Sequence, residues 1–320
     1  MATDAVLRSL FLIMEGLVVK NTGNSYLVRT ADKQVFDCHL KGNFRIQGIK
    51  STNPIAVGDN VEFDVRSAED CLITKLLPRR NYIVRRPANL SKQLHIIASN
   101  LDAAMLVVTI NHPVTSTVFI DRFLATCEAY SVPGMLLINK VDLYDDDERT
   151  YMDNLVRLYE QIGYPCYVVS AKTGEGVAEV AELLKNKITL LSGNSGVGKS
   201  SLVNAINPDF KARIGDLSDV HDAGMHTTTF SEMFEIAPDS FIVYTPGIRG
   251  FGTIDFKKEE VGHYFPDIFR FSSECRFGNC THTHEPGCAV LKAVEEHYIS
   301  ESRYNSYLSI MDDENDAKYR

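Results

Sequence analysis

The sequence of 320 residues contains no run of about 18 consecutive apolar residues, the length that a membrane-spanning helix needs. Its first residues, MATDAVLRSLFLIMEGLVV, are apolar in part but include Asp4 and Glu15 and lack a small-residue cleavage site. We therefore expect no membrane partner and no signal peptide, and we expect a cytoplasmic location.

Cysteines are few, and their number, seven, is odd. Cys38, Cys71, Cys127 and Cys166 stand singly in apolar stretches, so we expect them to be small core residues of a reduced compartment. The other three lie close together near the C-terminus.

An excess of positive charge is also missing, because the formal net charge is −9. This balance argues against a protein that coats nucleic acid non-specifically. Residues 1–90 nevertheless carry +4 and the remainder −13. A mildly basic N-terminal third fits either a localised RNA contact or an ordinary solvated surface.

Short strand-like runs fill residues 16 to about 77: GLVVK, SYLVRT, VFDCHL and NVEFDV, separated by segments of turn composition. Such spacing predicts a small barrel, either a five-stranded oligonucleotide-binding (OB-like) barrel or an SH3-like module. We assign residues 1–78 to this β-barrel as an RNA-binding domain. Residues 79–93 form a basic linker, which is either solvated or places Arg79, Arg80, Arg85 and Arg86 against RNA phosphates.

Residues 94–255 show apolar runs that alternate with amphipathic helical patterns. AAMLVVTI, GMLLIN, CYVVS and ITLLSG are typical of buried parallel strands, and apolar residues recur with helical spacing over 120–127, 152–159 and 177–184. This pattern predicts a doubly wound α/β domain. Residues 256–320 are expected to be a helical domain around a Cys/His cluster.

A phosphate-binding loop is indicated by GNSGVGKS at residues 193–200, which matches G-x-x-x-x-G-K-[ST] between a strand and a helix. We call these residues the phosphate loop. Its main-chain N–H groups and the helix N-terminus would bind phosphates. Lys199 would contact the β- and γ-phosphates, and Ser200 would ligate Mg²⁺.

Guanine recognition is indicated by NKVD at residues 139–142, the guanine motif, directly after a predicted strand. An ionised Asp142 offers two acceptors to the ring nitrogen and amine of guanine, an arrangement that adenine does not match. Lys140 would lie along the base, and Asn139 would connect this motif to the phosphate loop. SAK at residues 170–172 would cap the guanine carbonyl with its backbone. The three motifs together favour GTP over ATP.

The motifs follow an unusual order: guanine motif, SAK, phosphate loop, HTTT (226–229) and YTPG (244–247). The pocket depends on which strands are neighbours in space, so a permuted chain can build the same site. HTTT and YTPG are the two candidate switch segments. Both lead directly into the C-terminal region, which could transmit their motion to a partner.

Motif order, the preceding barrel, TPGIRGFG (245–252) and CRFGNCTHTHEPGC (275–288) together resemble the circularly permuted ribosome-assembly GTPases of the RsgA/YjeQ family. The resemblance covers nearly the whole chain. It implies late maturation of the small ribosomal subunit, with GTP hydrolysis stimulated by that subunit.

One position departs from that family, which usually has Asp before TPG where this chain has Tyr244. A phenol supplies no carboxylate at neutral pH, so hydrolysis could be weak unless a nearby acid substitutes. Ile248 occupies the place of the water-orienting Gln of Ras-like proteins. His226 is the candidate for that role that the resemblance suggests, although a lone histidine is often structural.

Cys275, Cys280, His282 and Cys288 form C-x4-C-x-H-x5-C, and three thiolates with one imidazole suit a tetrahedral zinc ion. Four protein ligands leave no open position, so the site should be structural. His284 is a competing ligand, but the family pattern favours His282.

The overall prediction is an α/β circularly permuted P-loop GTPase domain, with an N-terminal OB-like barrel and a C-terminal α-helical zinc-binding domain. It uses GTP/GDP, Mg²⁺ and one Zn²⁺ and acts on the small ribosomal subunit and its rRNA, and a monomer is the simplest expectation for its oligomeric state. Two other functions stay open: a GTP-binding assembly sensor with weak hydrolysis, and a P-loop kinase or metabolic NTPase, against which the guanine motif and SAK argue.

The candidate catalytic residues are His226 and Lys199. The candidate nucleotide-binding residues are Asn139, Lys140, Asp142, Ser170, Ala171, Lys172, Gly193, Asn194, Ser195, Gly196, Val197, Gly198, Lys199, Ser200, Ser201, Thr228 and Gly247.

Overall fold

The computed structural model describes residues 12–23, 25–40, 54–67, 70–85, 95–210, 232–244 and 256–316. The chain divides into two compact units. One unit comprises residues 1–100 and 228–234, and the other comprises residues 101–227 and 235–320. None of the helices within the described residues has the length and apolarity that crossing a bilayer requires.

The first unit contains a closed five-stranded β-barrel. Its strands are β1 (Leu12–Asn21), β2 (Tyr26–Arg29), β3 (Val35–Leu40), β4 (Asn60–Val65) and β5 (Cys71–Leu76). They pair in the order β1-β2-β3-β5-β4, and β4 pairs again with β1, which closes the barrel. Alternate residues of each strand point inward, so the predicted small barrel is confirmed.

Strand β5 was missed in the sequence, although its buried Cys71 and Ile73 alternate with the half-buried Leu72 and Thr74. Both side chains are fully buried in the barrel core. Cys38 lies directly opposite Cys71 in the parallel β3–β5 pair. Cys127 is buried as well, whereas Cys166 is only half-buried, so the expectation of core cysteines holds for three of the four single cysteines.

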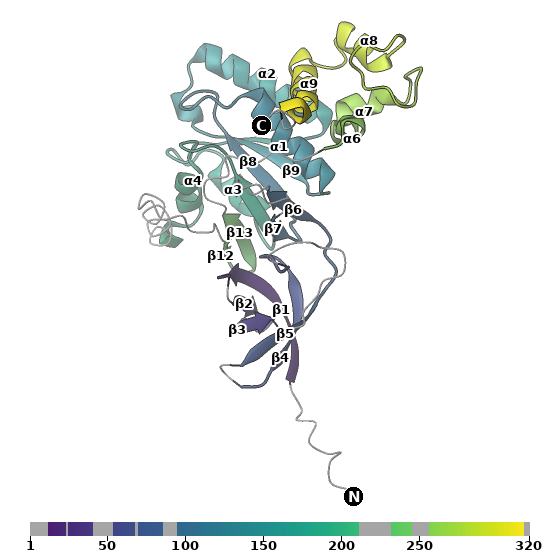
Figure 1. Cartoon of the computed structure of the whole chain (residues 1–320). Coiled ribbons are helices and arrows are strands. Elements are labelled where there is room, and N and C mark those ends of the chain that lie inside the picture. The colour runs from purple at the N-terminus through teal and green to yellow at the C-terminus, as the bar shows by residue number, and fades with distance from the viewer. Residues whose placement is uncertain are drawn as a thin grey trace, which may run out of the picture. The chain divides into compact units, whose positions relative to one another are not determined.

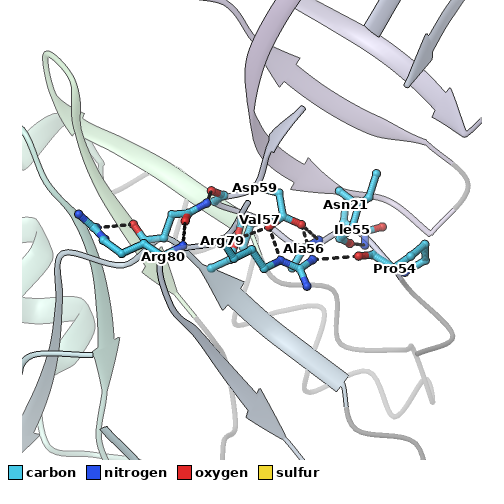
Figure 2. Close-up of polar contacts among 11 residues, drawn as sticks. Asn21, Pro54, Ile55, Ala56, Val57, Asp59, Arg79 and Arg80 are labelled. Carbon is cyan, nitrogen blue, oxygen red and sulfur yellow. Dashed lines mark hydrogen bonds and ion pairs between the residues drawn. The ribbon is translucent and has the colours of Figure 1, made fainter. Parts of the chain in front are cut away.

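A buried ion pair lies where a solvated linker or an RNA contact was expected (Figure 2). Arg79 donates from Nε and Nη2 to the two carboxylate oxygens of Asp59, each at 2.6 Å. The Arg79 side chain is 7% exposed and that of Asp59 is 0% exposed. Ser99 Oγ also donates to Asp59 Oδ1, at 2.5 Å. The interpretation of Arg79 as a phosphate contact is therefore wrong, because its guanidinium is already bound inside the protein.

The rest of the expected linker is also partly ordered into a hairpin. β6 (Tyr82–Arg85) pairs antiparallel with β7 (His95–Ser99). Arg80 donates from Nη2 to the carbonyl of Asn100 at 3.0 Å. The side chain of Arg85 and the whole of Arg86 lie outside the described residues, so their contact with RNA stays a prediction.

The second unit contains a parallel sheet whose order is β10-β9-β8-β11-β13. These strands are β8 (Ala103–Val108), β9 (Gly134–Ile138), β10 (Cys166–Val168), β11 (Ile188–Ser192) and β13 (Ser240–Tyr244). From β8 the chain adds β9 and β10 on one side of the sheet and then β11 and β13 on the other, so the strand order reverses between β8 and β11. In sheets of this kind ligands bind at the carboxyl ends of the strands on either side of such a reversal. β12 (Glu232–Ala237) and β13 were not recognised in the sequence.

Helices with clear end signals connect these strands. They are α1 (Thr117–Ala129), α2 (Asp146–Ile162), α3 (Val177–Leu183) and α4 (Lys199–Ile206). Ser116 caps the start of α1. A capping box of Asp145 and Glu148 begins α2, and Gly163 ends it. The apolar stripe that predicted α2 is its buried face, which includes Met152, Leu155 and Tyr159.

Within the described residues, four α-helices follow residue 256: α6 (Lys258–Val261), α7 (Pro266–Ser272), α8 (Ala289–Glu295) and α9 (Glu301–Asp316). The expected helical character of this region is therefore present, with a break between α8 and α9. Helix α9 lies beside α1 (Figure 1).

A buried arginine joins these helices. Arg303 of α9 is 1% exposed. It donates to Asp121 of α1 at 2.6 Å and to Asp267 of α7 at 2.8 Å. Tyr159 of α2 donates to the same Asp121 oxygen at 2.7 Å. One cation therefore neutralises two acids from separate helices, which fixes how α1, α7 and α9 pack.

Candidate functional site

The phosphate loop lies between the end of β11 and the start of α4, as the sequence predicted. Two of its glycines have backbone conformations and surroundings that exclude a side chain. Gly193 has φ +143°, and a Cβ there would lie 2.4 Å from the carbonyl oxygen of Val107. Gly198 has φ +96°, and its Cβ would lie 2.4 Å from Asn139 Nδ2. The loop can therefore pass close to neighbouring loops only with glycine at these positions.

Lys199 folds back over the phosphate loop from the first position of α4. Its Nζ donates to the carbonyls of Gly193 at 2.7 Å and Asn194 at 2.9 Å. Burial lowers the pKa of Lys199 from its ordinary value. Ser200 and Ser201 follow it in the first turn of the same helix. The ammonium group is thus held over the loop whose N–H groups would bind phosphate oxygens.

Asn139 connects the guanine motif with both other motifs. Its Nδ2 donates to the carbonyl of Val197 in the phosphate loop at 2.8 Å, across 58 positions of sequence. Its Oδ1 accepts from the N–H of Ala171 at 3.2 Å. Asn139 is 1% exposed. The expected connection to the phosphate loop is present, and the sequence had not indicated the second bond to the SAK segment.

Asp142 lies in the 3-10 turn Val141–Leu143, at the end of the guanine motif. Ser170 Oγ donates to its Oδ1 at 2.7 Å, and Lys172 Nζ lies 3.6 Å from its Oδ2. The hydrogen bond from Ser170, aided by Lys172, lowers the pKa of Asp142. The side chain of Asp142 is therefore ionised at neutral pH and offers acceptor oxygens, as recognition of a guanine edge requires.

Lys140 extends towards the phosphate loop. Its Nζ donates to the carbonyls of His112 at 2.5 Å and Gly196 at 2.7 Å. His112 belongs to the segment that follows β8. The loops after β8, β9, β10 and β11 therefore meet at the carboxyl edge of the sheet, at the reversal of strand order.

Three candidate residues of the switch segments, His226, Thr228 and Gly247, lie outside the described residues. The backbone of Tyr244 is described and ends β13, where it is the register partner of Leu191 in β11. Tyr244 thus ends the strand next to the one that leads into the phosphate loop.

The four residues of the Cys/His cluster come together between α7 and α8. Cys275, Cys280, His282 and Cys288 each place a ligand atom within 4.8 Å of the others. Cys275 Sγ lies 3.9 Å from Cys288 Sγ, and His282 Nδ1 lies 3.6 Å and 3.5 Å from these two sulfurs. His284 is exposed and bonds to Thr283, so the alternative ligand is excluded by geometry.

These distances fit a zinc ion. Tetrahedral zinc with ordinary bond lengths separates two sulfurs by about 3.8 Å and a sulfur from a nitrogen by about 3.6 Å. Burial lowers the pKa of His282, which favours the neutral imidazole that a metal needs. The donor set and its spacing therefore suit Zn²⁺, with all four positions filled by protein.

Hydrogen bonds from outside the cluster hold the metal-binding loop, residues 275–288. Tyr304 and Tyr307 of α9 donate to the carbonyls of His282 and Thr281, each at 2.7 Å. Within the loop, Glu285 accepts from the N–H groups of Thr281 and Thr283. Burial opposes ionisation of Glu285, but the bonds from Thr281 and nearby N–H groups lower its pKa. The sequence had indicated the ligands but not these supporting residues.

Two family models match the chain. The RsgA GTPase model matches residues 76–254, and the RsgA N-terminal domain model matches residues 15–73.

Curated relatives match over almost their full lengths. A "Small ribosomal subunit biogenesis GTPase RsgA" of Bacteroides fragilis is 59% identical over 307 residues, which is 96% of this chain and 99% of the relative. The protein of the same name from Porphyromonas gingivalis is 57% identical over 313 residues, with the same coverage.

Solved structures agree with these relatives. YjeQ from Thermotoga maritima has a TM-score of 0.76 at 36% identity and covers 94% of this chain and 98% of its own. YloQ, described as a circularly permuted GTPase, has a TM-score of 0.75 at 31% identity and covers 97% of both chains.

Proposed function

This chain belongs to the RsgA GTPase family of GTP-hydrolysing enzymes, and on that basis we propose that its hydrolysis of GTP serves late maturation of the small ribosomal subunit. Family membership gives the enzyme class and the fold. The nucleotide contacts, the partner contacts and the stimulation by the subunit are parts of the proposal. A cytoplasmic site of action follows from that partner.

The single observation that carries the proposal is the position of Asn139. Its side chain contacts the phosphate loop through Val197 and the SAK segment through Ala171. Three motifs that are far apart and permuted in sequence therefore surround one place at the edge of the sheet. This arrangement supports one nucleotide-binding site rather than three unrelated sequence matches.

In the proposed complex, the ionised carboxylate of Asp142 accepts from the ring N–H and the exocyclic amine of guanine. The backbone of residues 170–172 caps the guanine carbonyl, and the N–H groups of residues 193–198 bind the phosphates. Lys199 exchanges its contacts with Gly193 and Asn194 for the β- and γ-phosphates. The glycine backbone and the half-buried ammonium suit an anionic ligand.

Mg²⁺, when bound, neutralises phosphate charge, and Ser200 at the start of α4 would hold it. Tyr244 replaces the carboxylate that usually contributes to this metal shell in the family. Orientation of the attacking water is assigned to His226 or to a group of the partner. The basic barrel unit, with Arg85 and Arg86 but not the buried Arg79, provides the proposed rRNA contact.

The proposed zinc ion has a structural role. Its four ligands lie in one short loop, which α9 holds through Tyr304 and Tyr307. No position remains for substrate, so zinc would stabilise the C-terminal region rather than act on GTP.

GTP turnover by the purified protein, with and without small ribosomal subunits, tests this function. We expect slow basal turnover, strong stimulation by the subunit, and subunit binding that weakens with salt. ATP should neither compete with GTP nor be hydrolysed at a comparable rate. Turnover that is unchanged by the subunit would contradict the proposed role.

Tyr244 favours a second candidate, a GTP-binding assembly sensor that hydrolyses little. In that case GTP would bind tightly, but stimulated turnover would be absent and Tyr244→Asp would restore it. An unchanged rate and Mg²⁺ dependence in Tyr244→Asp would remove Tyr244 as the cause.

A further inference from the structure

A buried tyrosine lies behind the guanine motif and contacts two of the loops that form the site. Tyr144, directly after the turn Val141–Leu143, is 6% exposed. Its hydroxyl donates to the carbonyl of Asn139 at 2.5 Å and accepts from the N–H of Ile110 at 2.9 Å. One phenol thus joins the segment after β8 to the segment after β9.

The phenol extends the pairing of the two strands beyond their ends. β8 and β9 pair as far as Val108 and Ile138, and the N–H of Asn139 still donates to the Val108 carbonyl at 2.9 Å. The Tyr144 hydroxyl binds the next carbonyl of one loop and an N–H of the other. It therefore fixes the main chain at Asn139, from which the recognition side chains project.

Burial raises the pKa of Tyr144 to about 12. The hydroxyl therefore keeps its proton at any physiological pH and donates to Asn139 throughout. A phenylalanine of the same shape would leave the Asn139 carbonyl and the Ile110 N–H without this partner, at a buried position where that loss is costly.

Arg149 of α2 holds the same turn from the solvent side. Its Nη2 donates to the Val141 carbonyl at 2.9 Å, and its Nε donates to the Tyr144 carbonyl at 3.2 Å. Val141 and Tyr144 flank Asp142 in sequence. The turn that carries Asp142 is consequently attached to the start of α2 at both of its ends.

The start of α2 also contacts the segment after β8. Glu148, which takes part in the α2 capping box, accepts from Asn111 Nδ2 at 2.8 Å. Tyr144, Glu148 and Arg149 together connect the start of α2 to the segment after β8 and to the guanine motif after β9.

We propose that Tyr144 is a positioning residue for guanine recognition, assisted by Arg149. By fixing the main chain from Asn139 to the turn of Asp142, it places the Asp142 carboxylate where both donors of the guanine edge can reach it. This inference rests on the proposed assignment of Asp142 to guanine.

A tyrosine that only stabilised the fold would affect all nucleotides equally, so the test compares two bases. Inosine diphosphate lacks the exocyclic amine of GDP, and that amine meets only Asp142 in the proposed complex. The ratio of GDP to IDP affinity, measured by calorimetry with Mg²⁺, therefore reports the placement of Asp142. The variants are Tyr144→Phe and Arg149→Met, and the latter replaces an exposed side chain and leaves the buried Tyr144 hydroxyl in place.

Tyr159→Phe is the matched control. Tyr159 lies on α2, which begins just after Tyr144, and it is also buried, but its hydroxyl donates to Asp121 instead of to the segments after β8 and β9. It should lower thermal stability much as Tyr144→Phe does. We expect the GDP-to-IDP ratio to fall about three- to tenfold in Tyr144→Phe, by less in Arg149→Met, and to stay unchanged in Tyr159→Phe.

Equal losses of GDP and IDP affinity in Tyr144→Phe would overturn the inference and leave Asp142 as the guanine contact. A wild-type protein that binds GDP and IDP equally would instead contradict the assignment of Asp142, and the inference with it. The two failures are distinguished by the wild-type measurement alone.

Discussion

The guanine motif and the metal-binding loop both hold polar atoms at fixed positions in short irregular segments, but they are stabilised differently. The guanine motif is surrounded by protein hydrogen bonds, in which Asn139 donates to Val197, Ser170 to Asp142 and the Ile110 N–H to Tyr144. The metal-binding loop brings three thiols and an imidazole within 4.8 Å of one another. Without a metal, these four ligand atoms are held only indirectly, through the hydrogen bonds of Glu285 within the loop and those of Tyr304 and Tyr307.

The guanine motif and the metal-binding loop are therefore ordered by different interactions. The guanine motif follows a strand whose buried residues belong to the sheet, so its position is set before any ligand binds. The metal-binding loop lies between α7 and α8, both of seven residues, and depends on ligation and on the tyrosines of α9. We therefore expect the two segments to respond separately to metal removal.

The largest effect should follow loss of zinc. Binding of structural zinc is worth about 10–16 kcal/mol in zinc-finger peptides, so its removal should unfold the metal-binding loop. In Cys288→Ser we expect zinc content to fall to zero and amide-exchange protection to vanish over residues 275–288. GDP affinity should change less than about threefold, because the guanine motif and the SAK segment are held by their own hydrogen bonds.

Cys166→Ser is the matched control, since Cys166 is a half-buried thiol outside the cluster. It should retain zinc and the exchange protection. If Cys288→Ser lost GDP affinity together with the amide-exchange protection of the metal-binding loop, the two segments would not be independent.

The second effect concerns the attachment of α9 to α1. Arg303→Met would leave Asp121 and Asp267 buried without their cation, and breaking such a pair costs about 3–5 kcal/mol. Urea unfolding, followed by circular dichroism, should show this loss. Lys292→Met, which removes an exposed pair with Glu296, should change stability by less than about 0.5 kcal/mol. Similar losses in both variants would argue against a buried network.

The smallest effect is local to the guanine motif. The hydrogen bond from Ser170 lowers the pKa of Asp142, so Ser170→Ala should raise that pKa towards its usual value near 3.8. The ionised form would then be lost at a higher pH as the solution is acidified. A titration of the Asp142 carboxyl carbon by NMR measures the shift. Lys172→Met should give a smaller rise, because Lys172 is largely exposed.

Much of the fold follows from patterns within short windows of sequence. Alternating or continuous apolar runs predicted β1 to β4 and β8 to β11, and helical periodicity predicted α1, α2 and α3. β6 was missed because its stretch is rich in arginine and proline, which favours a linker prediction, and β7, a short apolar run just after that stretch, was not recognised either. Their pairing depends on contacts that a local pattern does not contain.

Arg79 shows why charge alone misleads. Arginines are rarely buried, so a basic segment is expected at the surface. Here Asp59, twenty residues earlier, supplies a carboxylate inside the fold. Nothing in the local sequence identifies that partner.

The candidate site shows the same limit. The residue types and spacing of a motif indicate what it binds. The sequence therefore identified Asn139, Asp142, Lys199 and the four metal ligands. Tyr144 and Arg149 act through main-chain groups, and such contacts leave no motif. The spacing left His284 open as a competing ligand, the family resemblance favoured His282, and the geometry of the cluster agrees with His282.

The most direct test of the guanine site exchanges the base that it accepts. Asp142→Asn replaces one carboxylate acceptor with an N–H₂ donor, which matches the 2-oxo group of xanthine instead of the 2-amino group of guanine. We predict that this variant loses at least about 100-fold in GDP affinity and gains affinity for XDP, while the wild-type protein shows the reverse preference. Unchanged GDP and XDP affinities in Asp142→Asn would contradict the account, because the base would then be held by other residues.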